Sequence, residues 1–305
     1  MLKQLIDTYP RILAECAIAE RLRRVPDVTL HPTLFNTPLI YGPDHARQAM
    51  SALYAEYLNT ARAAGLPLLL TAPTWRLDAE RVREAKVPTS INSDAVAYLI
   101  GLRDAFTQGS SPPSYVGALV GPRHDCYRPD LAPDSTVAEA FHRTQILELG
   151  ASPADFLLAQ TLPSVAEALG IARAMARTDK PYLISFCTGP DGHVLDGTPL
   201  PAAMEQIDQA TALARPPDGY FVNCTHPQFL LDAWPEGSLN RLIGIQANGS
   251  SKDVTKLDGA GSTQADPIED WARAMFELHK MHDVSILGGC CGTALAHLQA
   301  LVKPN

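Results

Sequence analysis

The strongest constraint on the fold is a repeated alternation of short apolar runs and longer amphipathic stretches. The apolar runs, rich in Leu and β-branched residues, predict eight strands at residues 11–16, 67–72, 115–120, 155–161, 182–187, 220–224, 242–246 and 284–288. Most are almost continuously apolar, which is typical of parallel strands buried on both faces. Apolar residues at helical spacing, bounded by Pro and Gly, predict helices at residues 46–64, 136–148, 163–176, 202–214, 267–281 and 293–302.

Eight strand-then-helix units in 305 residues favour one α/β architecture, the (β/α)8 or TIM barrel. The alternative is a doubly wound open sheet, which is also built from strand–helix–strand units. No GxGxxG pattern follows the first strand, and this disfavours the open sheet. Because no internal repeat or low-complexity linker divides the chain, we expect a single domain over residues 1–305.

The net charge of −8 argues against a general affinity for nucleic acid or anionic membranes. The longest apolar runs are too short to cross a bilayer, and the N-terminal residues lack the features of a signal peptide. Six cysteines are too few for a secreted disulfide scaffold. We therefore expect a cytoplasmic protein with reduced thiols and small-molecule partners. The exposed helices of a barrel also leave room for a homo-oligomer.

Three of the cysteines are expected at one rim of the barrel. Cys224 ends the sixth predicted strand, and the adjacent Cys290 and Cys291 follow the eighth, between glycines. The carboxyl ends of the strands carry the active site in such barrels. Three thiolates suit Zn²⁺ and leave a fourth position for water or substrate. Neighbouring residues of a strand point to opposite faces, so this pair can share an ion only beyond the strand end.

Two other interpretations of the cysteine pair remain. Cys290 and Cys291 could form a reversible disulfide, although a reducing compartment weighs against a permanent one. They could also lie by coincidence in a buried turn. We interpret Cys126 and Cys187 as small buried apolar residues.

The motif GGCCGT at residues 288–293, together with Asn-Cys-Thr at 223–225, resembles the homocysteine S-methyltransferase family. Segments 116–122, 154–168 and 185–200 resemble the family as well. The resemblance implies a (β/α)8 barrel with one Zn²⁺ bound by the three cysteines. It also implies an enzyme that moves a methyl group to a zinc-bound thiolate, most typically homocysteine, giving methionine. The implied donor is a small sulfonium or ammonium compound, with S-methylmethionine or S-adenosylmethionine ahead of betaine.

The resemblance also points to five substrate-binding residues: Glu15, Gln160, Ser185, Asn223 and Asn248. Two of them lie where the chain departs from the family. The family's glycine-rich first turn is replaced by residues 14–20, which include Glu15. Gln160 stands where the family usually has Glu, and a neutral amide attracts an ammonium group less strongly than a carboxylate does. The alternatives are a different thiol, a methyl group from a separate corrinoid protein, or a zinc-binding barrel without catalytic activity.

Other polar residues follow the predicted strands. Trp75, Arg76 and Arg123 come just after the second and third strands and are candidates for carboxylate recognition or for lining a donor pocket. His226 is interpreted as a surface residue at a helix start, and a contact with substrate or ligand is the alternative. Asp196 either shapes the mouth of the site or forms a turn.

Overall fold

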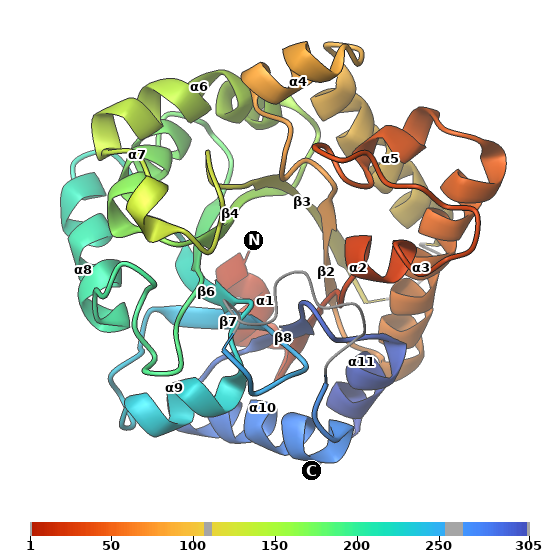
Figure 1. Cartoon of the computed structure of the whole chain (residues 1–305). Helices are drawn as coiled ribbons and strands as arrows, with labels where there is room; N and C mark the ends of the chain where they lie inside the picture. Colours follow the sequence, from red (N-terminus) through yellow and green to blue (C-terminus); the bar gives the residue numbers. More distant parts are fainter. Residues whose placement is uncertain (1, 107–111, 254–264, 304–305) are drawn as a thin grey trace.

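Eight parallel strands close into a barrel in chain order, with β8 pairing back onto β1 (Figure 1). The strands are β1 (Ile12–Ala14), β2 (Leu68–Ala72), β3 (Ser114–Val120), β4 (Phe156–Leu162), β5 (Tyr182–Phe186), β6 (Gly219–Asn223), β7 (Leu242–Ala247) and β8 (Ile286–Gly289). This computed structural model describes residues 2–106, 112–253 and 265–303. The predicted (β/α)8 barrel is confirmed, and the open sheet is excluded because the strand order is closed.

Most of the helices surround this barrel, and α1 lies across one end of it (Figure 1). They are α1 (Leu2–Thr8), α2 (Ala19–Leu22), α3 (Asp44–Ala64), α4 (Ala79–Ala85), α5 (Ile91–Phe106), α6 (Ser135–Ala151), α7 (Val165–Met175), α8 (Leu200–Thr211), α9 (Pro227–Ala233), α10 (Ile268–His282) and α11 (Leu295–Val302). Short 3-10 helices occur at Thr37–Tyr41 and Pro129–Leu131. Within the described residues, no helix is long and apolar enough to cross a membrane.

Large side chains fill the inside of the barrel. Phe156 and Phe221 are almost fully buried there, and two strand glycines make room for their rings. A Cβ atom at Gly117 would lie 2.3 Å from the Phe156 ring, and one at Gly244 would lie 2.3 Å from the Phe221 ring. Burying a Phe side chain stabilises the fold by roughly 1.5–3 kcal/mol, so a side chain at either glycine would displace a substantial part of this core.

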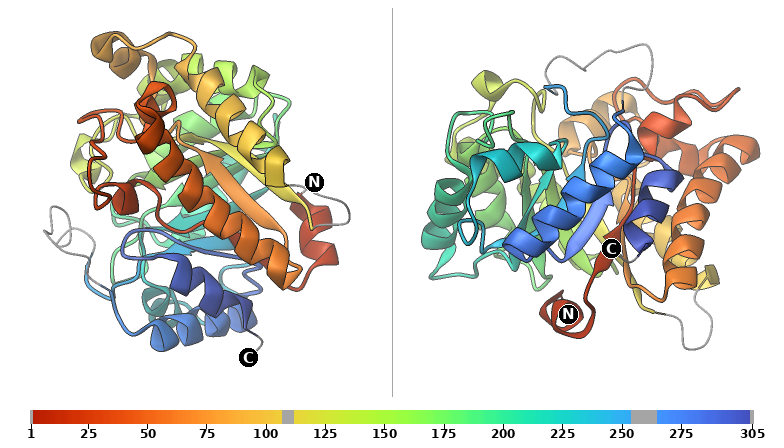
Figure 2. Two further views of the ribbon diagram at one scale, coloured as in Figure 1. Left: turned by 90° about the vertical axis from the view of Figure 1, so that its right-hand side faces the viewer. Right: turned by 90° about the horizontal axis from the view of Figure 1, so that it is seen from below.

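One end of the barrel is closed by α1. Leu2 and Leu5 on this helix are buried in the same apolar cluster as the interior residues Ile12 and Phe156. The helix lies across the end at which the strands begin (Figure 2). The opposite end, where the strands finish, is therefore the end that is left for a binding site.

The first strand is shorter than predicted. The sequence predicted a strand through Cys16, but β1 ends at Ala14. Glu15 and Cys16 therefore follow the strand, and both line a cavity at the open end of the barrel.

Candidate metal centre

Three cysteine sulfurs meet at the open end of the barrel. Cys224 comes directly after β6, and Cys290 and Cys291 come directly after β8. Their Sγ atoms all lie within 4.8 Å of one another, and the Cys224 and Cys290 sulfurs are 2.7 Å apart. All three thiols are free of disulfides. Their exposure increases from the buried Cys224 to the exposed Cys291, so the cluster opens toward the mouth of the barrel.

The turn after β8 brings the adjacent cysteines to one side. Gly292 has a φ of +78°, a left-handed conformation that side chains disfavour. Its backbone N–H donates a hydrogen bond to the Glu20 carboxylate. The Thr293 hydroxyl donates to the Cys290 carbonyl oxygen at 2.6 Å. These contacts fix the backbone on both sides of Cys291. Glu20 was not predicted as a site residue, because its role depends on a contact 272 residues away in the chain.

Asn223 ties the ends of three strands together beside Cys224. Its Oδ1 accepts hydrogen bonds from the Thr161 N–H at 2.8 Å and the Ser185 hydroxyl at 2.7 Å. Its Nδ2 donates to the Thr161 Oγ1 at 2.7 Å. Cys224 itself has a φ of +52°, which is uncommon for a residue with a side chain. The fully buried amide thus holds the strained segment that presents the first sulfur.

The electrostatics of the cluster favour a cation. Hydrogen bonds from the Cys224 and Cys291 thiols hold the pKa of the Cys290 thiol well below its ordinary value. The hydrogen bond to Cys290, followed by that to Cys291 and by burial, raises the pKa of Cys224. The hydrogen bond with Cys224 lowers the pKa of Cys291, but the hydrogen bond with Cys290 and burial outweigh it and raise this pKa as well, so the negative charge of the cluster lies on the Cys290 sulfur. Three thiolates form a donor set that matches the ligand preference of Zn²⁺ and leaves one position open.

A cavity of about 610 Å³ adjoins the sulfurs. Glu15 and Gln160 line it, as do all three cysteines. The Glu15 carboxylate is only 6% exposed, and it accepts hydrogen bonds from the N–H of Thr71, at 3.0 Å, and from the Thr71 hydroxyl. Burial raises the pKa of Glu15 to about 8, despite these bonds. Among the described residues no cation pairs with this carboxylate within 4.0 Å, so a cationic ligand group would relieve the cost of its burial.

Gln160 takes part in a chain of hydrogen bonds across the cavity floor. Its Nε2 donates to Gln246 Oε1 at 2.6 Å, and Gln246 Nε2 donates to the Glu15 carbonyl oxygen at 3.2 Å. Trp75 Nε1 donates to the Gln160 carbonyl oxygen at 2.8 Å. The amide oxygen of Gln160 accepts no hydrogen bond from the part of the chain that the structure describes. Gln246 was not predicted as a site residue, although it lies near the carboxyl end of β7, where barrel enzymes place their active-site residues.

Like Asn223, two further predicted substrate contacts lie behind the cavity lining. Ser185 is fully buried and donates to Asn223. Asn248 is also buried, and its backbone donates to the Thr225 carbonyl oxygen and accepts from Trp271 Nε1. Neither residue is among the described residues that line the cavity. If Ser185 and Asn248 affect substrate binding, they therefore do so through the residues that they position.

His226 and Asp196 have local structural contacts. His226 is the N-cap of α9, where its Nδ1 accepts from the Gln228 N–H at 3.3 Å. The prediction of a helix start is confirmed, but the side chain is buried and not on the surface. Asp196 accepts hydrogen bonds from the N–H groups of Val165 and Thr198, at 2.7 and 3.0 Å. Asp196 thus stabilises its own turn and the start of α7.

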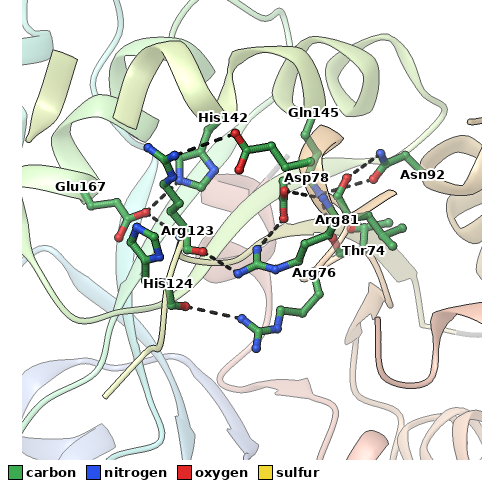
Figure 3. Close-up of polar contacts among 12 residues, drawn as sticks. Thr74, Arg76, Asp78, Arg81, Asn92, Arg123, His124, His142, Gln145 and Glu167 are labelled. Carbon is green, nitrogen blue, oxygen red and sulfur yellow. Dashed lines mark hydrogen bonds and ion pairs between the residues drawn. The ribbon is translucent and has the colours of Figure 1, made fainter. Parts of the chain in front are cut away.

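A buried polar network supports the loops after β2 and β3 (Figure 3). Arg81 pairs with Asp78 and also donates to the Arg123 carbonyl oxygen. The Arg123 N–H donates to the Glu167 carboxylate at 2.7 Å, and this carboxylate contacts His142 Nε2 at 2.9 Å. The two loops are thereby held against each other at the edge of the cavity. Apart from the local Asp78–Arg81 pair, these contacts join separate segments of the chain, so no local pattern predicted them.

The family model for homocysteine S-methyltransferase matches residues 12–304, nearly the whole chain. The chain belongs to the homocysteine S-methyltransferase family. It is therefore a methyltransferase, as the sequence predicted. Homocysteine S-methyltransferase YbgG of Bacillus subtilis is 24% identical over 313 residues, which cover 98% of this chain and 96% of that protein.

Solved structures of the homocysteine methyltransferase MmuM from Escherichia coli share the fold. The metallated form covers 99% of this chain and 98% of its own, with a TM-score of 0.73 and 19% identity. The oxidised form gives a TM-score of 0.76 at the same identity, with 98% of each chain covered. At this identity the likeness extends to the barrel, and the chemistry of the site depends on the residues of this chain.

Proposed function

We propose that this methyltransferase moves a methyl group from a small sulfonium donor, S-methylmethionine or S-adenosylmethionine, to the thiol of homocysteine, giving methionine. The observation that carries the proposal is the meeting of three cysteine sulfurs and the buried Glu15 carboxylate in one cavity. A substrate that carries both a thiol and an ammonium group finds a matching environment for each.

Cys224, Cys290 and Cys291 would hold the metal ion, and their donor set fits Zn²⁺. When bound, zinc lowers the pKa of a coordinating thiol, so that the thiolate is present at neutral pH. The remaining work belongs to the side chains of the cavity. Glu15 and the free amide oxygen of Gln160 would accept the ammonium group and thereby orient the thiol substrate.

Methyl transfer then requires alignment of the reacting atoms. The thiolate sulfur forms a bond to the methyl carbon while the bond from that carbon to the donor sulfonium breaks. The electron pair of the broken bond stays on the donor, which leaves as a neutral thioether. The cavity volume of about 610 Å³ provides room for two small molecules in contact, and the supporting networks limit how far its walls can relax.

The first experiment is a zinc measurement on protein purified under reducing conditions. We expect close to one zinc per chain, and incubation with L-homocysteine and S-methylmethionine should then yield methionine. Absence of zinc would overturn the metal assignment and leave the reversible disulfide. Zinc without turnover of either sulfonium donor would favour the non-catalytic barrel.

The remaining alternatives concern the substrates. A different thiol, or a methyl group delivered by a separate corrinoid protein, would leave the zinc requirement in place but change the productive pair. Assays with a panel of thiols and with methylcobalamin as donor separate these cases. We retain the single domain over residues 1–305 as part of this proposal.

A further inference from the structure

Four arginines line the cavity, and they fall into two pairs. Arg81 is neutralised by Asp78, and Arg123 lies 3.9 Å from Glu80. Arg23 and Arg76 make no ion pair within 4.0 Å with any carboxylate of the described chain. The cavity that receives the substrates therefore contains two guanidinium groups without a counter-charge.

Aromatic rings hold these two guanidinium groups in place. Phe35 and Trp75 stack at a centroid distance of 6.0 Å. The Arg76 guanidinium lies 5.2 Å from each ring centroid, and that of Arg23 lies 5.1 Å from the Phe35 centroid. Cation–π contacts position a guanidinium group without neutralising it or using its N–H donors. The Phe35 ring contacts both arginines. The backbone of Phe35 has a φ of +54°, which is an uncommon conformation for a residue with a side chain.

The donors of Arg76 are largely unused. Its Nε is buried and has no hydrogen-bond partner in the described chain. Its Nη1 donates only a long bond, 3.5 Å, to the His124 carbonyl oxygen (Figure 3). Asp125 also lines the cavity, but its Oδ1 accepts from the Tyr127 N–H, and it lies outside ion-pair distance of Arg76. A partly buried guanidinium with free donors has a strong preference for a carboxylate, which it binds through two parallel hydrogen bonds.

We propose that Arg23 and Arg76 form a carboxylate subsite for the methyl donor. This inference rests on the proposed function and specifies its donor as a sulfonium compound of the amino-acid type. The same carboxylate chemistry could come from the thiol substrate, but three features favour the donor. The thiol substrate has its sulfur at the cysteines and its ammonium at the buried Glu15. Arg23 is exposed at the mouth, and the cavity is large enough for a second molecule.

The test measures binding of two probes to the zinc-loaded protein by calorimetry. The probes are S-methylmethionine and (3-aminopropyl)dimethylsulfonium, which is the same compound without its carboxylate. We expect the Arg23→Met and Arg76→Met variants to bind S-methylmethionine about tenfold more weakly than the unmodified protein. Both variants should bind the carboxylate-free probe as the unmodified protein does. Arg62→Met is the control, because Arg62 is exposed on α3 and its side chain donates a hydrogen bond to Asn59 on the same helix, away from the cavity lining.

A second pair of probes identifies the source of the carboxylate. These probes are homocysteine and 3-mercaptopropylamine, which is homocysteine without its carboxylate. Weaker binding of homocysteine in the arginine variants, with S-methylmethionine unaffected, would overturn the assignment to the donor. Equal binding of S-methylmethionine by all variants, or none by the unmodified protein, would overturn the subsite itself. These measurements need no turnover, so a failure of the proposed reaction is seen separately, as absence of methionine from an enzyme that binds both substrates.

Discussion

The two sides of the cavity differ in how far the protein satisfies its own polar groups. On the side of β6 and β8, Asn223 makes three short hydrogen bonds, and Glu20 and Thr293 hold the turn around Cys291. On the side of β1 and β2, neither the buried Glu15 carboxyl group nor the Arg76 guanidinium has a side chain of opposite charge within 4.0 Å in the described chain. The first side is preorganised for a metal ion, and the second has groups left over for the substrates.

The largest expected effect is on the cysteine side. Cys291→Ser should lose bound zinc and lower kcat/KM on the order of 10³-fold, because a hydroxyl is a far poorer ligand than a thiolate. Cys126→Ser is the matched control, since Cys126 lines the cavity but lies outside the three-sulfur cluster. Zinc content by elemental analysis and initial rates check both. If Cys291→Ser retained as much zinc as the unmodified protein, the assignment of the cysteine side of the cavity to metal binding would be wrong.

The next effect tests the opposite side. Glu15→Gln should raise KM for homocysteine about 100-fold while zinc content stays unchanged, because an ammonium loses a buried carboxylate partner. The effect should be small for a thiol that lacks an amino group, such as 3-mercaptopropionate. A variant that lost zinc as well as substrate affinity would show that the two sides do not act separately.

A smaller change is expected from the support of the turn. Glu20→Ala removes the acceptor for the Gly292 N–H and should weaken zinc binding about tenfold, as is typical for residues behind a metal ligand. Glu20→Gln keeps an acceptor oxygen and should recover most of the affinity. Competition with a chelator measures both. If the two variants behave alike, the charge of Glu20 and not its hydrogen bond is what matters.

The smallest expected effect is on the pH dependence of stability. The folded protein raises the pKa of Glu15 to about 8, from an ordinary value of 4.5, so at neutral pH the folded state binds more protons than the unfolded state. This contribution to stability is fully present below pH 4.5 and is lost as the pH rises toward 8. Glu15→Gln should remove it, making Tm a few °C higher than in the unmodified protein at pH 8 but not at pH 5. If Tm plotted against pH gave parallel curves for Glu15→Gln and the unmodified protein between pH 5 and pH 8, the raised pKa of Glu15 would be contradicted.

Much of the fold was predictable because barrel strands carry a local signal. Continuous apolar runs mark buried parallel strands, and most ends of the predicted helices lie close to Pro or Gly. Helix α5 was missed although Ile91, Ala95 and Leu99 recur at helical spacing and are fully buried. Helix α9 has only seven residues, too few for a periodic pattern.

The site was predictable in part, for a related reason. The cysteines could be assigned to strand ends, and strand ends converge in a barrel. The contacts of Glu20, Gln246 and Arg23 could not be assigned, since each depends on side-chain packing between segments that are distant in sequence. Their residue types are common in loops, so no local pattern distinguishes them.

The pairing of β1 with β8 has a consequence for folding. Ile12 pairs with Ile286, and the Gly289 N–H donates to the Glu15 carbonyl oxygen just before the cysteine pair. The segments that set the turn around Cys291 thus come from opposite ends of the chain. Because closing such a long loop costs entropy before its contacts can form, we expect these contacts to form late, after the intervening units have folded. The formation of the three-sulfur cluster during refolding would therefore report when the barrel closes. A folding intermediate in which β8 has not yet paired with β1 would lack the cluster but would retain most of its helices.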